Sequence, residues 1–260
     1  MAPQVNIFAG SLIVLMMLFC GYPVLLQSHY VGFSKDNYVA QNVSINLDRS
    51  VFTVSEKFLS VAIDSNIMRH HWPHVNFTSE RLFNLARGLS PAFLRIGGTA
   101  GDFLIYDDSQ GLQKPKNVSN FTITHQDLDK IHLLSSKAGW DVMFGLNVLL
   151  RTQDGSWDAS NPKEIMQYVA EHGYNFGWEL GNEPNLFVDF GKSVSPEELA
   201  EDFHTLRAIL QSSPQFGNYL VGPDVTTVSN HSKSANFFER YSFCQFRLIG
   251  LIQVFCVYVH

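Results

Sequence analysis

Residues 175–185 read NFGWELGNEPN, and this stretch decides the fold prediction. Residues 175–180 are mostly apolar and aromatic, which is typical of a strand that is buried on both faces. Pro184 has no backbone N–H to donate to a neighbouring strand, so the strand must end before it. Asn182 and Glu183 therefore stand at the carboxyl end of a predicted buried strand.

Strand-like and helix-like patterns alternate on both sides of this stretch, across residues 58–224. Further strands are predicted at 58–64, 92–98, 141–149 and 219–223, and helices at 78–89, 125–138, 162–172, 195–210 and from 234. Ser195 and Glu198 have the spacing of a capping box at the start of the fourth helix. Such alternation predicts an α/β fold with a parallel sheet.

Two architectures fit this alternation, an open doubly wound sheet and a (β/α) barrel. A dinucleotide-binding fingerprint is missing, because Gly97-Gly98 lacks both a third glycine and a helix directly after it. Polar residues gather where the strands end, at positions that form the catalytic rim of a barrel. They are Asp64, Arg95, Thr99, Asn147, Asn182, Glu183 and Asp224. We therefore predict a (β/α)8 TIM-barrel type fold, truncated after about five βα units.

Three regions are predicted along the chain. Residues 1–28 form a signal peptide or signal anchor, residues 29–241 a partial barrel domain, and residues 242–260 an atypical apolar tail. Residues 7–26 are almost continuously apolar, and breaks at Gly21 and Pro23 favour a cleaved signal over a membrane anchor or a buried helix. The apolar end of the tail fits a sixth strand or an accidental terminus and is short for a membrane span.

Glycosylation acceptor patterns support entry into the secretory pathway, with an extracellular, lysosomal or membrane-associated destination. The Asn-x-Ser/Thr sites are Asn42, Asn76, Asn117, Asn120 and Asn230. Three cysteines are too few for a disulfide scaffold once a signal is removed, so the fold must depend on its core. A net charge of −6 argues against nucleic acid as a partner.

Glu183 has the position that glycoside hydrolysis requires of a general acid, a carboxylic acid that protonates the leaving oxygen. Trp178 and its apolar neighbours are expected to shield this carboxylate from water, and Asn182 could bind a sugar hydroxyl. An isolated Asn-Glu-Pro is more often a turn with a solvated glutamate. The full context of residues 178–185, on the fourth predicted strand, favours the catalytic interpretation.

Residues 178–185 resemble the acid/base motif of the heparanase family. Residues 87–105 contain RGLSPAFLRIGGT and DFLI, which are similar to its second strand and turn. Residues 144–152 and 222–225 resemble its third and fifth strands. The resemblance implies a (β/α)8 barrel with an appended β-sandwich, and a retaining endo-β-glucuronidase activity on heparan sulfate or a related glucuronide-containing polysaccharide.

The resemblance also implies site residues. Glu183 corresponds to the general acid/base, Asn182 to a ligand of the substrate hydroxyl, and Arg95 to an interior arginine near the nucleophile. The substrate contacts implied in addition are Asp64, Asn66, Thr99, Lys114 and Lys116. The alternatives are an ordinary buried ion pair for Arg95 and simple solvation for the two lysines. Glu179 is predicted to be structural, and neither a metal nor another cofactor is expected.

Two departures from the family bear on function. Retaining hydrolysis needs a second carboxylate at ~5–5.5 Å, and we expect no nucleophile in this chain, because the family carries it on the seventh strand. A catalytically inactive, glycan-binding or, through residues 7–26, membrane-tethered protein is therefore the alternative. Asp189 and residues 226–229 replace basic or polar family positions, which puts a preference for highly sulfated substrate in doubt.

Overall fold

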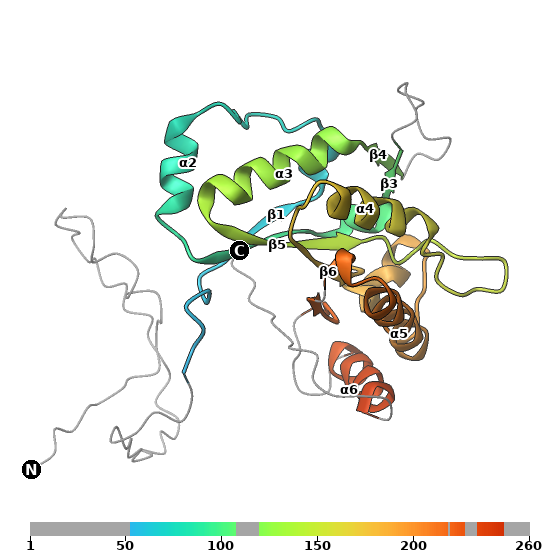
Figure 1. Ribbon diagram of the computed structural model, residues 1–260. Coiled ribbons are helices and arrows are strands. Elements are labelled where there is room, and N and C mark those ends of the chain that lie inside the picture. Colours follow the sequence, from blue (N-terminus) through green and yellow to red (C-terminus); the bar gives the residue numbers. More distant parts are fainter. Residues whose placement is uncertain (1–52, 108–119, 218, 227–232, 247–260) are drawn as a thin grey trace, which may run out of the picture. The chain divides into compact units, whose positions relative to one another are not determined.

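The computed structural model describes residues 53–107, 120–217, 219–226 and 233–246, coloured in Figure 1. A five-stranded sheet forms its centre, and every neighbouring pair of strands in this sheet is parallel. The strand order is β1 (Val61–Asp64), β2 (Ala92–Gly97), β5 (Trp140–Leu146), β6 (Phe176–Leu180) and β7 (Leu220–Val221). Neighbours thus follow chain order, without the reversal found at the switch point of a doubly wound sheet.

Helices and short 3-10 turns connect these strands, and a second, two-stranded parallel sheet follows β2. The small sheet pairs β3 (Leu104–Tyr106) with β4 (Phe121–Ile123). The helices are α1 (Asn66–Arg69), α2 (Glu80–Arg87), α3 (His125–Ala138), α4 (Ser160–Glu171), α5 (Pro196–Ser212) and α6 (Lys233–Phe246). The 3-10 turns are η2 (Thr99–Phe103), η3 (Pro184–Phe190) and η4 (Pro214–Phe216). Figure 1 shows α3 lying along β5 and α6 beside α5.

Local capping explains where several helices begin and end. The Ser195 hydroxyl accepts a hydrogen bond from the Glu198 N–H, and the Glu198 carboxylate accepts one from the Ser195 N–H, so the predicted capping box of α5 is confirmed. Helix α3 has the predicted bounds and ends at Gly139, whose φ of +73° is left-handed. The Ser79 hydroxyl caps α2 by accepting the Leu82 N–H.

The two faces of the sheet differ in character. Leu94, Phe144 and Trp178 belong to one face, and they are buried in a single core together with apolar residues of the helices. Arg95 and Glu179 belong to the opposite face, where Gly97, Gly145 and Gly177 leave space beside them. A sheet covered by helices on both faces would be apolar on both. Helices therefore cover one face. The other carries Arg95, Glu179 and glycines, together with the apolar side chains of Phe93 and Met143.

The sheet in the described part of the chain is open. Strands β1 and β7 each pair on one side only, so closure into a barrel stays a prediction. The first strand begins at Val61 and not at residue 58, because the Ser60 hydroxyl rather than a backbone carbonyl accepts the Phe93 N–H. Residues 242–246 continue α6, so the boundary expected after residue 241 falls inside a helix.

Several sequence predictions lie outside the described residues. These are residues 7–26, the end of the tail from residue 247, Lys114, Lys116, Asn42, Asn117 and Asn230. Asn76 is exposed, and its side-chain oxygen accepts hydrogen bonds from the N–H and hydroxyl of Thr78. Across the described ranges, none of the helices combines the length and the apolar character that crossing a membrane requires.

Candidate active site

The turn that carries Glu183 has an unusual backbone. Glu183 follows β6 with a φ of +48°, and Gly181, two residues earlier, has a φ of +74°. A left-handed conformation is uncommon for glutamate and persists only where the surroundings impose it. Its own carbonyl accepts the Leu186 N–H at 2.8 Å and so starts η3, and Pro184 prevents the strand from continuing.

Asp102 holds this turn from the neighbouring η2. Its two carboxylate oxygens each lie 3.2 Å from the backbone nitrogen of Asn182, the residue before Glu183. Burial raises the pKa of Asp102 well above its usual value, although the hydrogen bond from Asn182 acts in the opposite direction. A side chain at Gly181 would meet Val148 at 2.7 Å, so only glycine fits at this point of the turn.

Arg95 joins the three strands β2, β6 and β7 at the site. Its Nε donates to Glu179 Oε2 at 2.7 Å, and its Nη2 donates to Asp224 Oδ2 at 2.6 Å. The same Nη2 also donates to the side-chain oxygen of Asn182 at 3.1 Å. Space for the guanidinium depends on Gly97, where an added Cβ would lie 2.8 Å from the Arg95 Cζ. Arg95 therefore orients Asn182 and neutralises part of the buried negative charge.

Two carboxylates share this single arginine, which sets their protonation. Burial raises the pKa of Glu179 to about 7, against the lowering influence of Arg95 and with a smaller raising effect of Asp224. Burial also raises the pKa of Asp224, again opposed by Arg95, and the charge of Glu183 raises it further. Glu183 directly follows Asn182, whose side-chain oxygen accepts from Arg95, so the turn of Glu183 borders the cluster of Arg95, Glu179 and Asp224.

A hollow of about 340 Å³ opens beside this cluster at the ends of β1 and β2. The lining residues are Asp64, Asn66, Arg69, Thr99, Ala100 and Phe103. The structure thus brings Asp64, Asn66 and Thr99 together, as the prediction of a common cleft requires. Asp64 accepts the Asn66 N–H at 2.8 Å, and its carboxylate packs over Gly98. Glu183 is not among the lining residues. The contact between Phe103 of the hollow and Phe190 connects the hollow to the 3-10 turn that follows Glu183.

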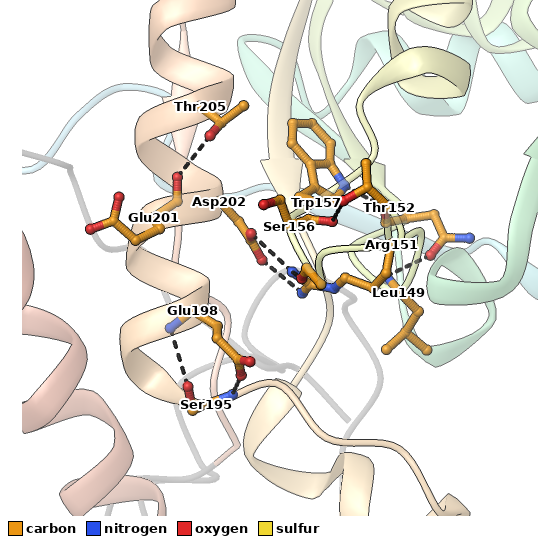
Figure 2. A network of polar contacts seen from close by, with 12 residues as sticks. Leu149, Arg151, Thr152, Ser156, Trp157, Ser195, Glu198, Glu201, Asp202 and Thr205 are labelled. Atoms are coloured by element: carbon orange, nitrogen blue, oxygen red, sulfur yellow. Dashed lines mark hydrogen bonds and ion pairs between the residues drawn. The ribbon is translucent and has the colours of Figure 1, made fainter.

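The loop after β5 borders the same edge and is tied to α5. Figure 2 shows the guanidinium of Arg151 facing the carboxylate of Asp202, with nitrogen–oxygen distances of 3.0 and 2.7 Å. Burial raises the pKa of Asp202, and the hydrogen bond from Arg151 acts in the opposite direction. Trp157 of the same loop donates its indole N–H to the Asn147 carbonyl at 3.0 Å. The loop is therefore fixed from two sides.

The sequence prediction is wrong for Trp178 and incomplete elsewhere. Trp178 lies in the core on the helix-covered face, where its Nε1 donates to the Phe216 carbonyl at 2.6 Å, so it does not shield Glu183. Sequence reasoning also missed Asp102, and it did not associate Arg69 or Phe103 with the cleft. The one available signal for Asp102 was an acidic residue directly after a predicted strand-end turn.

Comparison with known proteins gives the family. The model of glycosyl hydrolase family 79, N-terminal domain, matches residues 42–243. The chain belongs to this family. Heparanase from Bos taurus is 32% identical over 223 residues, covering 68% of this chain and 41% of the relative. Family 79 contains glycosidases, and the resemblance to heparanases inferred from the sequence motifs is confirmed.

Other relatives of this family 79 chain differ in activity. Inactive heparanase-2 from Homo sapiens is 29% identical, with coverage of 70% of this chain and 41% of the relative. Hyaluronoglucuronidase from Hirudo nipponia is 30% identical, covering 70% of this chain and 43% of the relative. The chain thus spans less than half the length of the curated relatives that it matches.

One solved structure supports the fold of this family 79 chain. A 4-O-α-L-rhamnosyl-β-D-glucuronidase from Fusarium oxysporum superposes with a TM-score of 0.50 at 20% identity, covering 74% of this chain and 42% of that chain. At this level of identity the likeness concerns the fold alone. It agrees with the α/β architecture and the parallel sheet described above.

Proposed function

We propose that this chain carries the acid/base part of a glycoside hydrolase that cleaves glucuronide links in heparan sulfate or a related polysaccharide. The observation that carries the proposal is the left-handed turn at Glu183, which sits at the carboxyl end of β6 and is held by Asp102 through Asn182. Such constrained backbone is typical of functional sites. The names of the family and of its relatives support the substrate class.

In the proposed reaction, Glu183 protonates the leaving glycosidic oxygen while a second carboxylate, which is not assigned among the described residues, attacks the anomeric carbon and forms the glycosyl-enzyme intermediate. The side-chain oxygen of Asn182 faces Arg95, which directs its amide nitrogen away from the arginine. That nitrogen is the group with which Asn182 would donate a hydrogen bond to a sugar hydroxyl. Arg95 and Asp102 act as positioning residues, because they fix Asn182 and its backbone rather than contact the sugar.

The proposal includes a barrel for the fold. Five strands follow chain order, and helices cover one face of the sheet only. In a (β/α)8 barrel the helices form an outer ring, and side chains at the carboxyl ends of the strands surround the substrate. The face that carries Arg95 and Glu179 then corresponds to the barrel interior, and the five strands to an arc of it.

Binding of a glycan without hydrolysis is the second candidate. Retaining hydrolysis needs a second carboxylate ~5–5.5 Å from the acid. Among the described residues, Asp224 is the carboxylate whose charge interacts with Glu183, and it is engaged by Arg95. The 29% identity to a relative named inactive heparanase-2 favours the same alternative.

The decisive test compares the wild-type chain with Glu183→Gln in a heparan sulfate depolymerisation assay read by size-exclusion chromatography. We expect the variant to lose roughly 10²- to 10⁴-fold in rate, the usual contribution of a general acid. Glu201→Gln on the exposed side of α5 is the matched control and should cleave normally. Equal cleavage by Glu183→Gln would refute the assignment. Glycan binding without cleavage by either protein would favour the second candidate.

A further inference from the structure

Phe190 places a partly exposed aromatic ring at the edge of the core, with one side packed on the buried Phe187 at a centroid distance of 5.5 Å. It is 39% exposed, whereas Phe187 of the same turn is fully buried. Its ring centroid lies 5.9 Å from that of Phe103, at an interplanar angle of 63°. Phe103 also lines the hollow of Asp64 and Asn66. Because η3 starts one residue after Glu183, this aromatic pair connects the hollow with the acid-bearing turn.

The chemistry of this pair suits a sugar ring. A pyranose ring in a β-linked chain has a face made of C–H groups and an edge made of hydroxyls. The C–H face is apolar and gains contact energy against an aromatic side chain. Asp64, Asn66 and Thr99 would take the hydroxyls along the edge. An apolar surface with a few convergent polar groups is the usual composition of a small-ligand site.

The charges around Phe190 restrict which sugar ring can bind against it. Asp189 directly precedes Phe190 and is exposed, and Asp64 is a further acidic residue in the lining of the hollow. Arg69 lines the hollow and lies over the Phe121 ring. Arg95 pairs with Glu179 and Asp224. A sulfate ester on a ring at Phe190 would lie in the electrostatic field of the adjacent residue Asp189, and like charges at short range repel each other.

We propose that Phe190, supported by Phe103, is a stacking platform for an unsulfated sugar ring of the bound glycan. The inference rests on the proposed function for the glucuronide class of the ligand, and it adds a specificity-determining residue and the charge state of the ring. The platform adjoins the hollow through Phe103 and belongs to the 3-10 turn that follows Glu183.

The test measures binding, with the full chain carrying Glu183→Gln so that no turnover occurs. Two probes of equal length are titrated by calorimetry, hexasaccharides of alternating glucuronate and N-acetylglucosamine, one unsulfated and one sulfated. Phe190→Ala should weaken binding of the unsulfated probe about tenfold, as truncation of an aromatic contact residue commonly does. Phe190→Trp should retain binding. Val188→Ala, in the same turn and 66% exposed, is the matched control and should bind normally.

Each outcome bears on a different part of the inference. Unchanged affinity of Phe190→Ala overturns the platform but leaves the proposed function in place. Tighter binding of the sulfated probe than of the unsulfated one overturns the preference for an unsulfated ring. Absence of binding to both probes overturns the platform and the substrate class together. If binding is normal but no Glu183-dependent cleavage occurs, the proposed hydrolase function is overturned and the platform stays in place.

Discussion

At the scale of single residues, Arg95 determines how much charge the site can bury. One guanidinium serves two carboxylates, Glu179 and Asp224, which come from different strands. Its planar fork of donors allows both pairs and the contact with Asn182 at once, which the single ammonium of a lysine would not reproduce. With both acids ionised the three side chains carry a net negative charge, which agrees with the raised pKa values of both carboxyls.

The raised pKa of Glu179 predicts how stability depends on pH. Burial brings the folded-state pKa to about 7, from an unfolded value of 4.5. The folded state therefore holds this proton more tightly, so its contribution to the free energy of unfolding is complete below the unfolded value and is lost as the pH rises through about 7. Urea denaturation should show that the free energy of unfolding falls more between pH 5 and pH 8 for wild type than for Glu179→Gln. Equal decreases in unfolding free energy for the two proteins would contradict the raised pKa of Glu179.

Gly98 should control the position of Asp64. It has a φ of +96°, and a Cβ there would lie 2.8 Å from Asp64 Oδ2. Gly98→Ala is expected to cost about 1–3 kcal/mol of unfolding free energy and to weaken oligosaccharide binding, because the carboxylate must move. Gly155→Ala is the matched control, since Gly155 has a φ of +89° and no atom within 4 Å of its Cβ. Thermal melts and calorimetry would measure both effects, and the control should lose stability without losing affinity.

At the scale of elements, Asp202 of helix α5 holds the loop after β5 through its ion pair with Arg151 (Figure 2) and a hydrogen bond from the Trp157 backbone. Asp202→Ala would leave Arg151, which is largely buried, without its carboxylate, and we expect a loss of about 2 kcal/mol. Limited proteolysis should then cut within residues 152–156, a turn that this loop holds in place. Glu201→Ala, the exposed neighbour on α5, is the control and should remain resistant. Equal resistance of Asp202→Ala would show that the loop is fixed by Trp157 alone.

At the scale of the whole described domain, stability should be unequal across the sheet. Strands β2, β5 and β6 have partners on both sides, whereas β1 and β7 are each paired on one side within the described residues. Amides of β5 should therefore exchange with solvent about tenfold more slowly than those of β1 and β7, because their release requires wider unfolding. Hydrogen exchange followed by mass spectrometry measures this order. Slower exchange in β7 than in β5 would indicate a further partner on that edge.

The sequence alone determined the local elements and the place of the acid. Helix α3 and the capping box at Ser195 follow from side chains within four positions of each other, and so does the strand end before Pro184. The alternation of strands and helices gave the α/β class with a parallel sheet. The motif around Glu183 gave the family, although the catalytic role of Glu183 stays a prediction.

Only the tertiary structure decided which residues meet. Arg95 and Asp224 are 129 positions apart, and Asp102 and Asn182 are 80 apart, so no local pattern specifies their hydrogen bonds. Strand register and burial bring them together, and burial also sets their protonation. The contact between Phe103 and Phe190 likewise arises from two separate turns. Local propensity depends on near neighbours in the chain, whereas a site depends on distances that only packing fixes.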